Sequence, residues 1–238
     1  MRKEYIEVEG IKIEIRRTEK RGQISLGFDK NGVLYVEAAR GESLDNVQCF
    51  ILKHIRWLKK RLEFNEKHKT ANHVYAEGER FYFRGMTYPL KLDVCDERPS
   101  LSFNGGVFIA RGQIAKNGKI DRDLMHWLFT KWYARRLEEI LKKEFPAWCK
   151  MVGAGPQKVS VKDVKSRWGS CSSKGNMMFS AALALVPPHL FEYIVVHELC
   201  HIFEMNHSER FWKLVGKYCP DWKECRKDLN DNACKYRW

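Results

Sequence analysis

The chain has 238 residues, of which 44% are hydrophobic, and this predicts a globular protein of one large or two small domains and excludes a disordered chain. No apolar run approaches the roughly 18 residues of a membrane span, and the first residues, Met1–Tyr5, precede no apolar core of a secretory signal. The formal charge of +13 is compatible with nucleic acid as a partner, although no base-reading motif accompanies it.

The eight cysteines include no C-x-x-C pair and lie mostly within apolar patterns. We therefore expect reduced thiols, as in a cytoplasmic protein that is not bound to a membrane. The sequence does not define an oligomeric state.

The N-terminal forty residues alternate between apolar and polar side chains, which is typical of strands. Turn-forming residues follow the first and third of these runs, so two hairpins are expected to form a small antiparallel sheet. The expected strands cover residues 5–8, 11–15, 24–28 and 33–36.

The hydrophobic period changes from two to nearly four at residue 43. Apolar side chains then recur at helical spacing as far as Leu62, and Ser43 is a suitable N-cap, so one helix should cover the sheet. The polar segment 63–72 follows and is the expected linker. We therefore expect an N-terminal β-rich domain over residues 1–68 and a second domain over residues 69–238.

The second domain is expected to begin with four further strands, near residues 81–83, 88–94, 101–103 and 107–109. A long amphipathic helix starts after Asp121 and should end near Pro146, because proline cannot continue the backbone hydrogen bonds of a helix. Two more β-like runs, 159–161 and 177–180, are separated by the glycine- and serine-containing segment 166–176, which indicates a hairpin.

The segment 195–201, with the sequence VVHELCH, carries the clearest chemical signal in the chain. In a helix, His197 and His201 lie one turn apart on one face and could bind the same metal ion. Glu198 lies beside that face, where it could reach a metal-bound water without being a ligand. This is the H-E-x-x-H arrangement of zinc hydrolases, in which the ion acts as a Lewis acid and the glutamate takes the proton of the water.

A third protein ligand would leave one coordination position open, and His207 is the candidate. His207 follows His201 by six residues, so an unbroken helix would point it away from the pair. The helix should therefore end between Phe203 and His207, with Asn206 in the left-handed conformation, and Ser208 should cap a new helix. The turn would bring His207 back towards the metal.

These residues together resemble the YgjP-like family of metal-dependent hydrolases, which is related to SprT-like and WLM zincins. The resemblance covers residues 159–218 most closely and rests on the order and spacing of Ser166-Arg167-Trp168-Gly169-Ser170-Cys171, Pro187, His197-Glu198-Leu199-Cys200-His201, Met205-Asn206-His207-Ser208 and Phe211-Trp212. It implies an α+β fold, with an N-terminal antiparallel β-sheet and helix followed by a zincin-like metallopeptidase core. It also implies Zn²⁺ as cofactor, His197, His201 and His207 as ligands and Glu198 as base.

The leading hypothesis is a zinc-dependent metallohydrolase, in particular a peptidase, that cleaves a peptide or protein with a water activated by Glu198. By resemblance to zincins, the strand 177–182 could bind substrate as an added strand, and Phe179 within it is a candidate substrate contact. Arg167 is a candidate for binding substrate or stabilising an oxyanion, and a structural ion pair beneath the hairpin is the alternative.

Two alternative functions stay open from the sequence. The charge and the SprT-like resemblance would also suit a DNA-associated protein-processing factor or scaffold. A structural zinc site could include Cys171 or Cys200, and such a closed site would have no catalytic water. Glu209 and Glu224 are alternative third ligands, whereas Glu204, in place of the metzincin glycine, argues against a metzincin.

Overall fold

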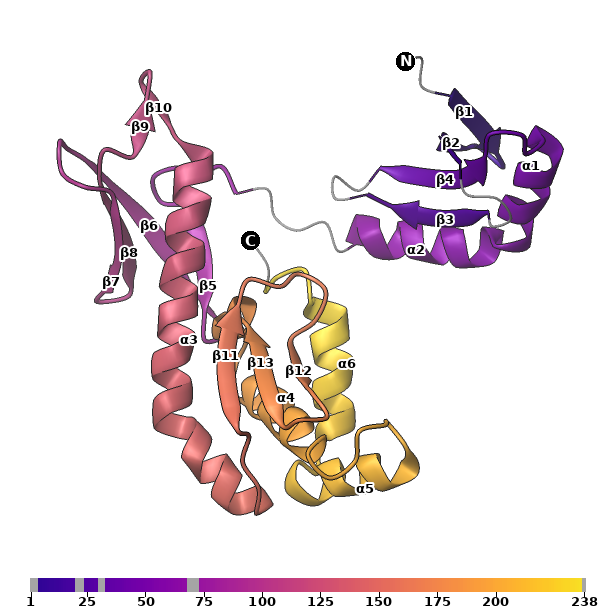
Figure 1. Cartoon of the computed structure of the whole chain (residues 1–238). Coiled ribbons are helices and arrows are strands. Elements are labelled where there is room, and N and C mark those ends of the chain that lie inside the picture. The colour runs from indigo at the N-terminus through magenta and orange to yellow at the C-terminus, as the bar shows by residue number, and fades with distance from the viewer. Residues whose placement is uncertain (1–3, 20–23, 30–32, 68–72, 237–238) are drawn as a thin grey trace. The chain divides into compact units, whose positions relative to one another are not determined.

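The computed structural model describes residues 4–19, 24–29, 33–67 and 73–236. Helices and several small sheets share the chain, so the α+β class expected from the sequence is confirmed (Figure 1). The chain divides into an N-terminal unit, Met1–Lys67, and a C-terminal unit, His68–Trp238. Among the described residues, no helix is both long and apolar enough to cross a bilayer.

The N-terminal unit contains one sheet with the strand order β1-β2-β4-β3. Its strands are β1 (Glu4–Val8), β2 (Ile11–Thr18), β3 (Ser25–Phe28) and β4 (Leu34–Ala39). Both expected hairpins are antiparallel, but β2 and β4 pair in parallel, so the sheet is mixed and not wholly antiparallel as expected. In this sheet β4 lies in the interior and β3 at the edge. This order fits their side chains, because Leu34, Val36 and Ala38 of β4 are buried, whereas no side chain of β3 is buried.

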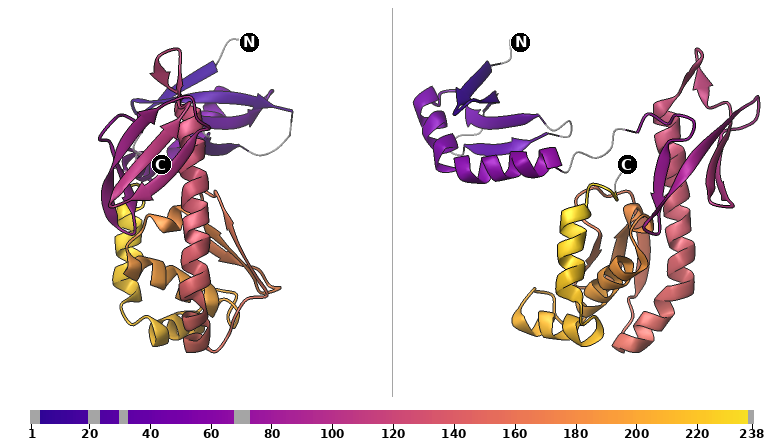
Figure 2. Two further views of the ribbon diagram at one scale, coloured as in Figure 1. Left: turned by 90° about the vertical axis from the view of Figure 1, so that its left-hand side faces the viewer. Right: turned by 180° about the vertical axis from the view of Figure 1, so that it is seen from behind.

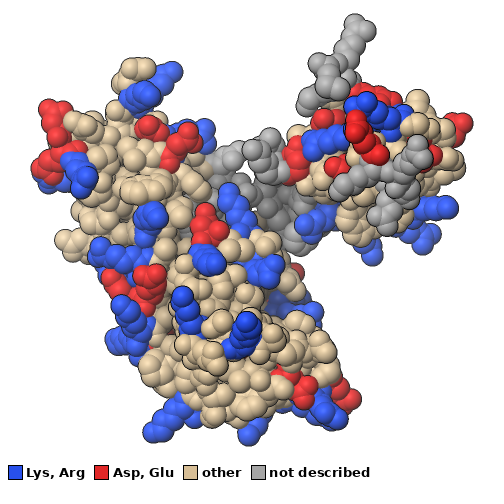
Figure 3. All heavy atoms as spheres, in the orientation of Figure 1, with Lys and Arg blue, Asp and Glu red and all other residues tan. Residues whose placement is uncertain are grey.

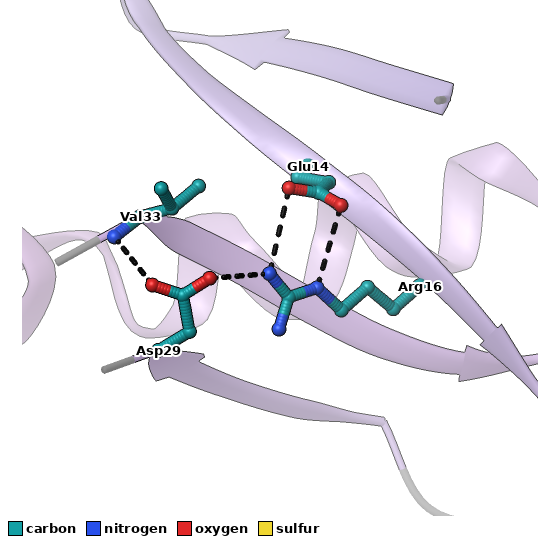
Figure 4. A network of polar contacts seen from close by, with 4 residues as sticks. All are labelled: Glu14, Arg16, Asp29 and Val33. Atoms are coloured by element: carbon teal, nitrogen blue, oxygen red, sulfur yellow. Dashed lines mark hydrogen bonds and ion pairs between the residues drawn. The ribbon is translucent and has the colours of Figure 1, made fainter. Parts of the chain in front are cut away.

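A polar network connects Asp29, which follows β3, with Val33, which precedes β4, and with β2 (Figure 4). The guanidinium of Arg16 contacts the carboxylate of Asp29 at 2.7 Å and that of Glu14 at 3.4 Å. Asp29 also accepts a hydrogen bond of 3.0 Å from the backbone N–H of Val33. Because the side chains of Glu14, Arg16 and Asp29 are partly buried, water screens these ion pairs less than pairs on an open surface.

Two helices, α1 (Leu44–Lys53) and α2 (Ile55–Lys67), complete the N-terminal unit. Ser43 caps α1 as expected, but His54 ends it with φ −105° and ψ 6°, so the single expected helix is divided. The break allows Ile51 and Leu58 both to be fully buried in the core. The expected linker 63–72 is helical over its first five residues, and residues 68–72 lie outside the described part.

The C-terminal unit begins with a sheet of strand order β5-β6-β8-β7, in which β6 and β8 are parallel. The strands are β5 (Arg80–Phe83), β6 (Met86–Val94), β7 (Ser100–Asn104) and β8 (Val107–Gly112). These are the four strands that the sequence predicts. A short hairpin that the sequence analysis did not predict follows, with β9 (Ala115–Lys116) and β10 (Lys119–Ile120).

The second sheet of this unit has the order β11-β13-β12, with β13 in the centre. Its strands are β11 (Lys158–Lys162), β12 (Gly169–Cys171) and β13 (Asn176–Ser180). The sequence predicts a hairpin between the runs that form β11 and β13, but these two strands are parallel. The antiparallel partner of β13 is β12, which lies within the segment expected to link them. A one-turn helix, η1 (Ala181–Ala184), follows β13 directly.

The long helix α3 (Arg122–Val152) runs past both sheets of the C-terminal unit (Figures 1 and 2). It starts at the N-cap Asp121 as expected, but it continues through Pro146, where the sequence predicted its end. Proline removes one backbone hydrogen bond from the helix. The helix nevertheless continues because Phe145 before the proline and Val152 after it are both buried in the core.

The central helix of the C-terminal unit is α4 (Pro188–Cys200), and Pro188 suits its first position because proline has the backbone φ of a helix and needs no N–H partner there. It packs against α3, β12, α5 (Glu209–Tyr218) and α6 (Trp222–Asn232). Every residue from Tyr193 to Val196 is buried, so the helix is covered on all its faces in this region. The elements packed around α4 therefore determine the position and orientation of its last turn.

The turn between β5 and β6 is hydrogen-bonded to the segment that precedes α4. The backbone N–H groups of Arg84 and Gly85 donate to the carbonyls of Ala184 and Leu185, at 2.9 and 2.8 Å. Gly85 has φ +82°, and a Cβ atom there would lie 2.8 Å from the Cα atom of Pro187. A larger residue would therefore push against the start of α4.

We predict that Gly85→Ala lowers the free energy of unfolding by about 1–3 kcal/mol more than Gly78→Ala does, because overpacking has a cost of this size. Gly78 is a matched control, since its φ of +79° is similar but a Cβ atom there would meet nothing within 4 Å. Urea unfolding of both variants measures the difference. Equal losses in the two variants would contradict the close packing at Pro187.

Candidate metal centre

The end of α4 differs in detail from the expectation. His201 is the C-cap, with the right-handed values φ −65° and ψ −15°, so the helix ends before Phe203. The backbone N–H groups of His201, Ile202 and Phe203 donate to carbonyls three residues earlier, which tightens the last turn. Asn206 is not among the residues with positive φ. The chain thus returns to His207 without the left-handed residue that the sequence analysis expected.

Three histidines lie together at this turn. Ring nitrogens of His197, His201 and His207 all lie within 4.8 Å of one another. The Nε2 atoms of His197 and His207 are 3.1 Å apart. Two ligands of a tetrahedral ion with bonds of about 2.0–2.1 Å are roughly 3.3 Å apart, so the two rings are spaced as ligands of one ion would be.

The alternative ligands considered from the sequence do not join this cluster. In the described part of the chain, no other group of three or more His, Cys, Asp or Glu side chains meets the spacing of a metal site. Cys171 and Cys200 are absent from the group, and so are Glu209 and Glu224. Glu209 instead forms an ion pair of 2.9 Å with Lys213.

The rings of His197 and His201 are in surroundings that favour the neutral form, which is the form that binds a metal ion. The Nδ1 atom of His201 lies 3.0 Å from the backbone carbonyl of Glu204, and because a carbonyl only accepts, this nitrogen carries the proton. Burial, with smaller contributions from His201 and His207, lowers the pKa of His197 to about 3. Burial also lowers the pKa of His201. Neutral imidazoles keep a lone pair for a metal ion.

Two buried polar atoms at the site lack a protein partner, and the one on Glu198 supports the fit of a metal-bound water. These atoms are Nδ1 of His197 and Oε2 of Glu198. Buried polar atoms are almost always hydrogen-bonded in folded proteins. The close pair of ring nitrogens is formed by the Nε2 atoms of His197 and His207, so Nδ1 of His197 is the nitrogen that would not bind the ion. Oε2 of Glu198 belongs to a side chain that lines the same cleft as the three histidines, where a metal-bound water would be its partner.

Glu198 is 6% exposed. Burial raises the pKa of its carboxyl to about 8, and the positive charge of Arg167 opposes this rise. Gly169 of β12 packs directly on this side chain, since a Cβ atom there would lie 2.7 Å from both Cγ and Oε1 of Glu198. The missing side chain of Gly169 therefore provides the space that the carboxylate occupies.

A cleft of about 420 Å³ opens over the cluster. Its lining residues come from the segment around β12 and from the end of α4 and the turns after it: Ser166, Arg167, Gly169, Ser170, Cys171, His197, Glu198, His201, Met205 and His207. Arg167 is exposed, and among the described residues its guanidinium forms no ion pair. The candidate base and the candidate cationic contact thus share one cleft with the three histidines.

The structure does not bring Phe179 into this cleft. Its side chain is fully buried, and its ring packs against Phe145 with centroids 6.0 Å apart. The strand β13 that carries it is paired on both sides, so it has no free edge for a substrate strand. The sheet edge beside the cleft belongs to β12. The backbone N–H and C=O groups of Ser170 point towards β13, whereas those of Gly169 and Cys171 point away from β13 and form the free edge.

Gly169 is the residue that the sequence analysis missed most clearly. The sequence pattern assigns Gly169 to the segment that links two β-like runs. In the structure it lies in β12 and touches the candidate base. An isolated glycine among residues that can form a strand often marks a close approach of another group. That signal was present between Trp168 and Ser170.

Two histidines from the end of one helix, a third just before the next helix and a buried glutamate define a metal-dependent hydrolase site of the H-E-x-x-H class. The chain belongs to the YgjP-like family, whose metallopeptidase domain matches residues 22–232. The resemblance stated from the sequence is therefore confirmed, and the chain is a metal-dependent hydrolase of a metallopeptidase family.

A comparison with curated proteins gave no match. Among solved structures, the crystal structure of the metallopeptidase zymogen abylysin of Pyrococcus abyssi is similar to part of the chain. It has 23% sequence identity and a TM-score of 0.35, and the alignment covers 37% of this chain and 90% of that one.

We predict that Gly169→Ala lowers turnover of a peptide library by about 10–100-fold while bound metal stays at the wild-type level, because a displacement of about 1 Å at the reacting groups has an effect of this size. The three heavy atoms nearest to the new methyl group would all belong to Glu198. Gly155→Ala is the control, since a Cβ atom there would only make an ordinary contact of 3.5 Å with Cys149. Turnover in Gly169→Ala equal to that of the control would contradict the contact.

The two shifted pKa values make opposite predictions for the stability of the metal-free protein. His197, with its pKa lowered to about 3 from 6.5, contributes stability that is lost as the pH falls through this interval. Glu198, with its pKa raised to about 8 from 4.5, contributes stability that is present below 4.5 and lost as the pH rises towards 8.

Glu198→Gln removes the second effect, since glutamine does not ionise. In the presence of a chelator, the melting temperature of this variant relative to wild type should therefore rise between pH 5 and pH 8. An increase of at least about 2 °C is expected, because about 1 kcal/mol shifts the melting temperature of a domain of this size by 2–4 °C. A difference that is the same at both pH values would rule out the raised pKa.

Proposed function

We propose that this protein is a zinc-dependent peptidase in which His197, His201 and His207 bind one Zn²⁺ ion and Glu198 is the general base. The observation that carries the proposal is the cluster of three ring nitrogens within 4.8 Å of one another, beside a buried carboxylate on an open cleft. Imidazole ligands suit zinc, and catalytic zinc sites keep three protein ligands and one open position.

The role of Glu198 follows from its surroundings. Zn²⁺ bound at the three histidines would supply Lewis acidity and lower the pKa of a water molecule. Oε2 of Glu198 has no protein partner, so it is available to accept a proton from that water. Burial disfavours the charged carboxylate, so Glu198 would also hold the proton after accepting it and pass it to the leaving amine.

Two further groups in the cleft would act on the substrate. Arg167 could donate hydrogen bonds to the carbonyl oxygen as negative charge develops there, or bind a carboxylate of the peptide. The backbone groups of Gly169 and Cys171 on the edge of β12 could pair with an extended peptide, which would align it along the cleft. This edge replaces the strand of Phe179 as the proposed substrate-binding element.

The alternative of a DNA-associated factor or scaffold with a structural zinc site has less support. A closed structural site would need a fourth protein ligand, and no cysteine or carboxylate of the described residues joins the three histidines. On the face seen in Figure 3, lysine and arginine side chains are dispersed among uncharged ones. Together with the net charge of +13, this supports only electrostatic, salt-sensitive contact with nucleic acid.

We predict that Glu198→Gln and His201→Ala fail in different ways. Glu198→Gln keeps the size of the side chain but cannot accept the proton, so zinc content should stay near one ion per chain. Turnover of a peptide library should fall by about 10²–10⁴, the usual share of general acid-base catalysis. His201→Ala should lose both zinc and turnover, because two histidines hold zinc far less well than three.

Elemental analysis and turnover of both variants test the proposal. Wild-type turnover in Glu198→Gln would end the proposed mechanism, and a structural zinc site would then be the better explanation if His201→Ala also lowered the melting temperature. Full zinc binding by His201→Ala would show that the ligand set is wrong.

A further inference from the structure

The three proposed ligands are held in place by different contacts. His197 is part of the buried helix α4, and the ring of His201 is fixed by the hydrogen bond to the carbonyl of Glu204. His207 is exposed and precedes α5. Within the described part of the chain, the one hydrogen bond of its ring is the contact of 3.1 Å with His197. Another type of contact must therefore orient this ring.

Aromatic stacking provides that contact. The ring of His207 stacks on Trp212 of α5, with centroids 5.6 Å apart and an interplanar angle of 24°. Phe211 meets the same ring at its edge, with centroids 4.8 Å apart. The indole of Trp212 therefore covers one face of the imidazole and limits how the ring can rotate.

Trp212 in turn contacts two residues of α6. Trp222, the first residue of α6, stacks on Trp212 with centroids 4.3 Å apart and an interplanar angle of 17°. The guanidinium of Arg226 also lies over the Trp212 ring, 4.9 Å from its centroid. Trp222 itself packs closely on α5, since a Cβ atom at Gly216 would lie 3.3 Å from its Nε1 atom.

We propose that Trp222 is a positioning residue for the metal centre, which holds Trp212 and through it the third ligand, His207, in the orientation that binds the ion. The inference rests on the proposed ligand set. A continuous stack of Trp222, Trp212 and His207 connects α6 to the site, although α6 carries none of the three histidines. This gives the C-terminal helix a role in metal affinity.

The test measures the dissociation constant for Zn²⁺ by competition with a chelating indicator on the full chain. Trp222→Leu should weaken binding by about 10–100-fold, the usual effect of losing a group that orients a ligand. Trp222→Phe keeps a flat ring for the stack and should stay within about 3-fold of wild type. Trp127→Leu is the matched control, because Trp127 is 53% exposed on α3 and remote from the stack.

Melting temperatures of the metal-free variants show whether each one folds. If Trp222→Leu does not fold, Trp222→Met replaces it, because the flexible methionine side chain fills irregular space without offering a flat face. Equal weakening by Trp222→Leu and Trp222→Phe would overturn the stacking role, since packing volume alone would then explain the loss.

His207→Ala separates this inference from the proposed function. If His207→Ala loses zinc affinity while Trp222→Leu binds zinc as wild type does, only the role of Trp222 is refuted. If His207→Ala keeps wild-type affinity, the proposed ligand set itself is wrong. Loss of affinity in both variants, with wild-type binding by Trp127→Leu, is the expected result.

Discussion

Exclusion of water from the last turn of α4 is the constraint on which the site depends. Charged side chains are costly to bury, so His197 stays neutral and Glu198 holds its proton more tightly than in water. The elements packed around α4 create this environment, and the cleft opens at the end of the helix. A site with the same residues on an exposed helix would lack both properties.

The residue of β12 that packs on Glu198 has to be a glycine. The carboxylate of Glu198 leaves no room for a side chain at position 169. Because this residue is a glycine, β12 can approach α4 closely. This approach also brings the free edge of β12 to the cleft. One glycine therefore sets the position of the candidate base and of the backbone groups available to a peptide.

The sequence predicted those features that depend on neighbouring residues. The i, i+4 spacing placed His197 and His201 on one face of a helix, and Ser208 capped the next helix as expected. The order of strands depends on contacts between distant segments, so the parallel pairing of β2 and β4 and the central place of β13 could not be read from alternation alone. Because β13 is the central strand of its sheet, the structure does not support the substrate contact expected for Phe179.

The break at His54 and the passage of α3 through Pro146 have a related explanation. In both places the local signal was weaker than the burial of residues on either side, Ile51 and Leu58 in one case and Phe145 and Val152 in the other. The stacking of Trp222 on Trp212 likewise joins two helices, and nothing in the spacing of the two residues indicates it.

The outermost proposed ligands, His197 and His207, are only ten residues apart in the chain. An ion that joins them closes a short loop, so it removes little conformational entropy from the unfolded chain compared with a link between distant segments. The C-terminal unit also has a large apolar core of its own. We therefore expect metal supply to act as an on-off control of chemistry in a chain that is already folded, unlike zinc fingers, which fold only when the ion binds.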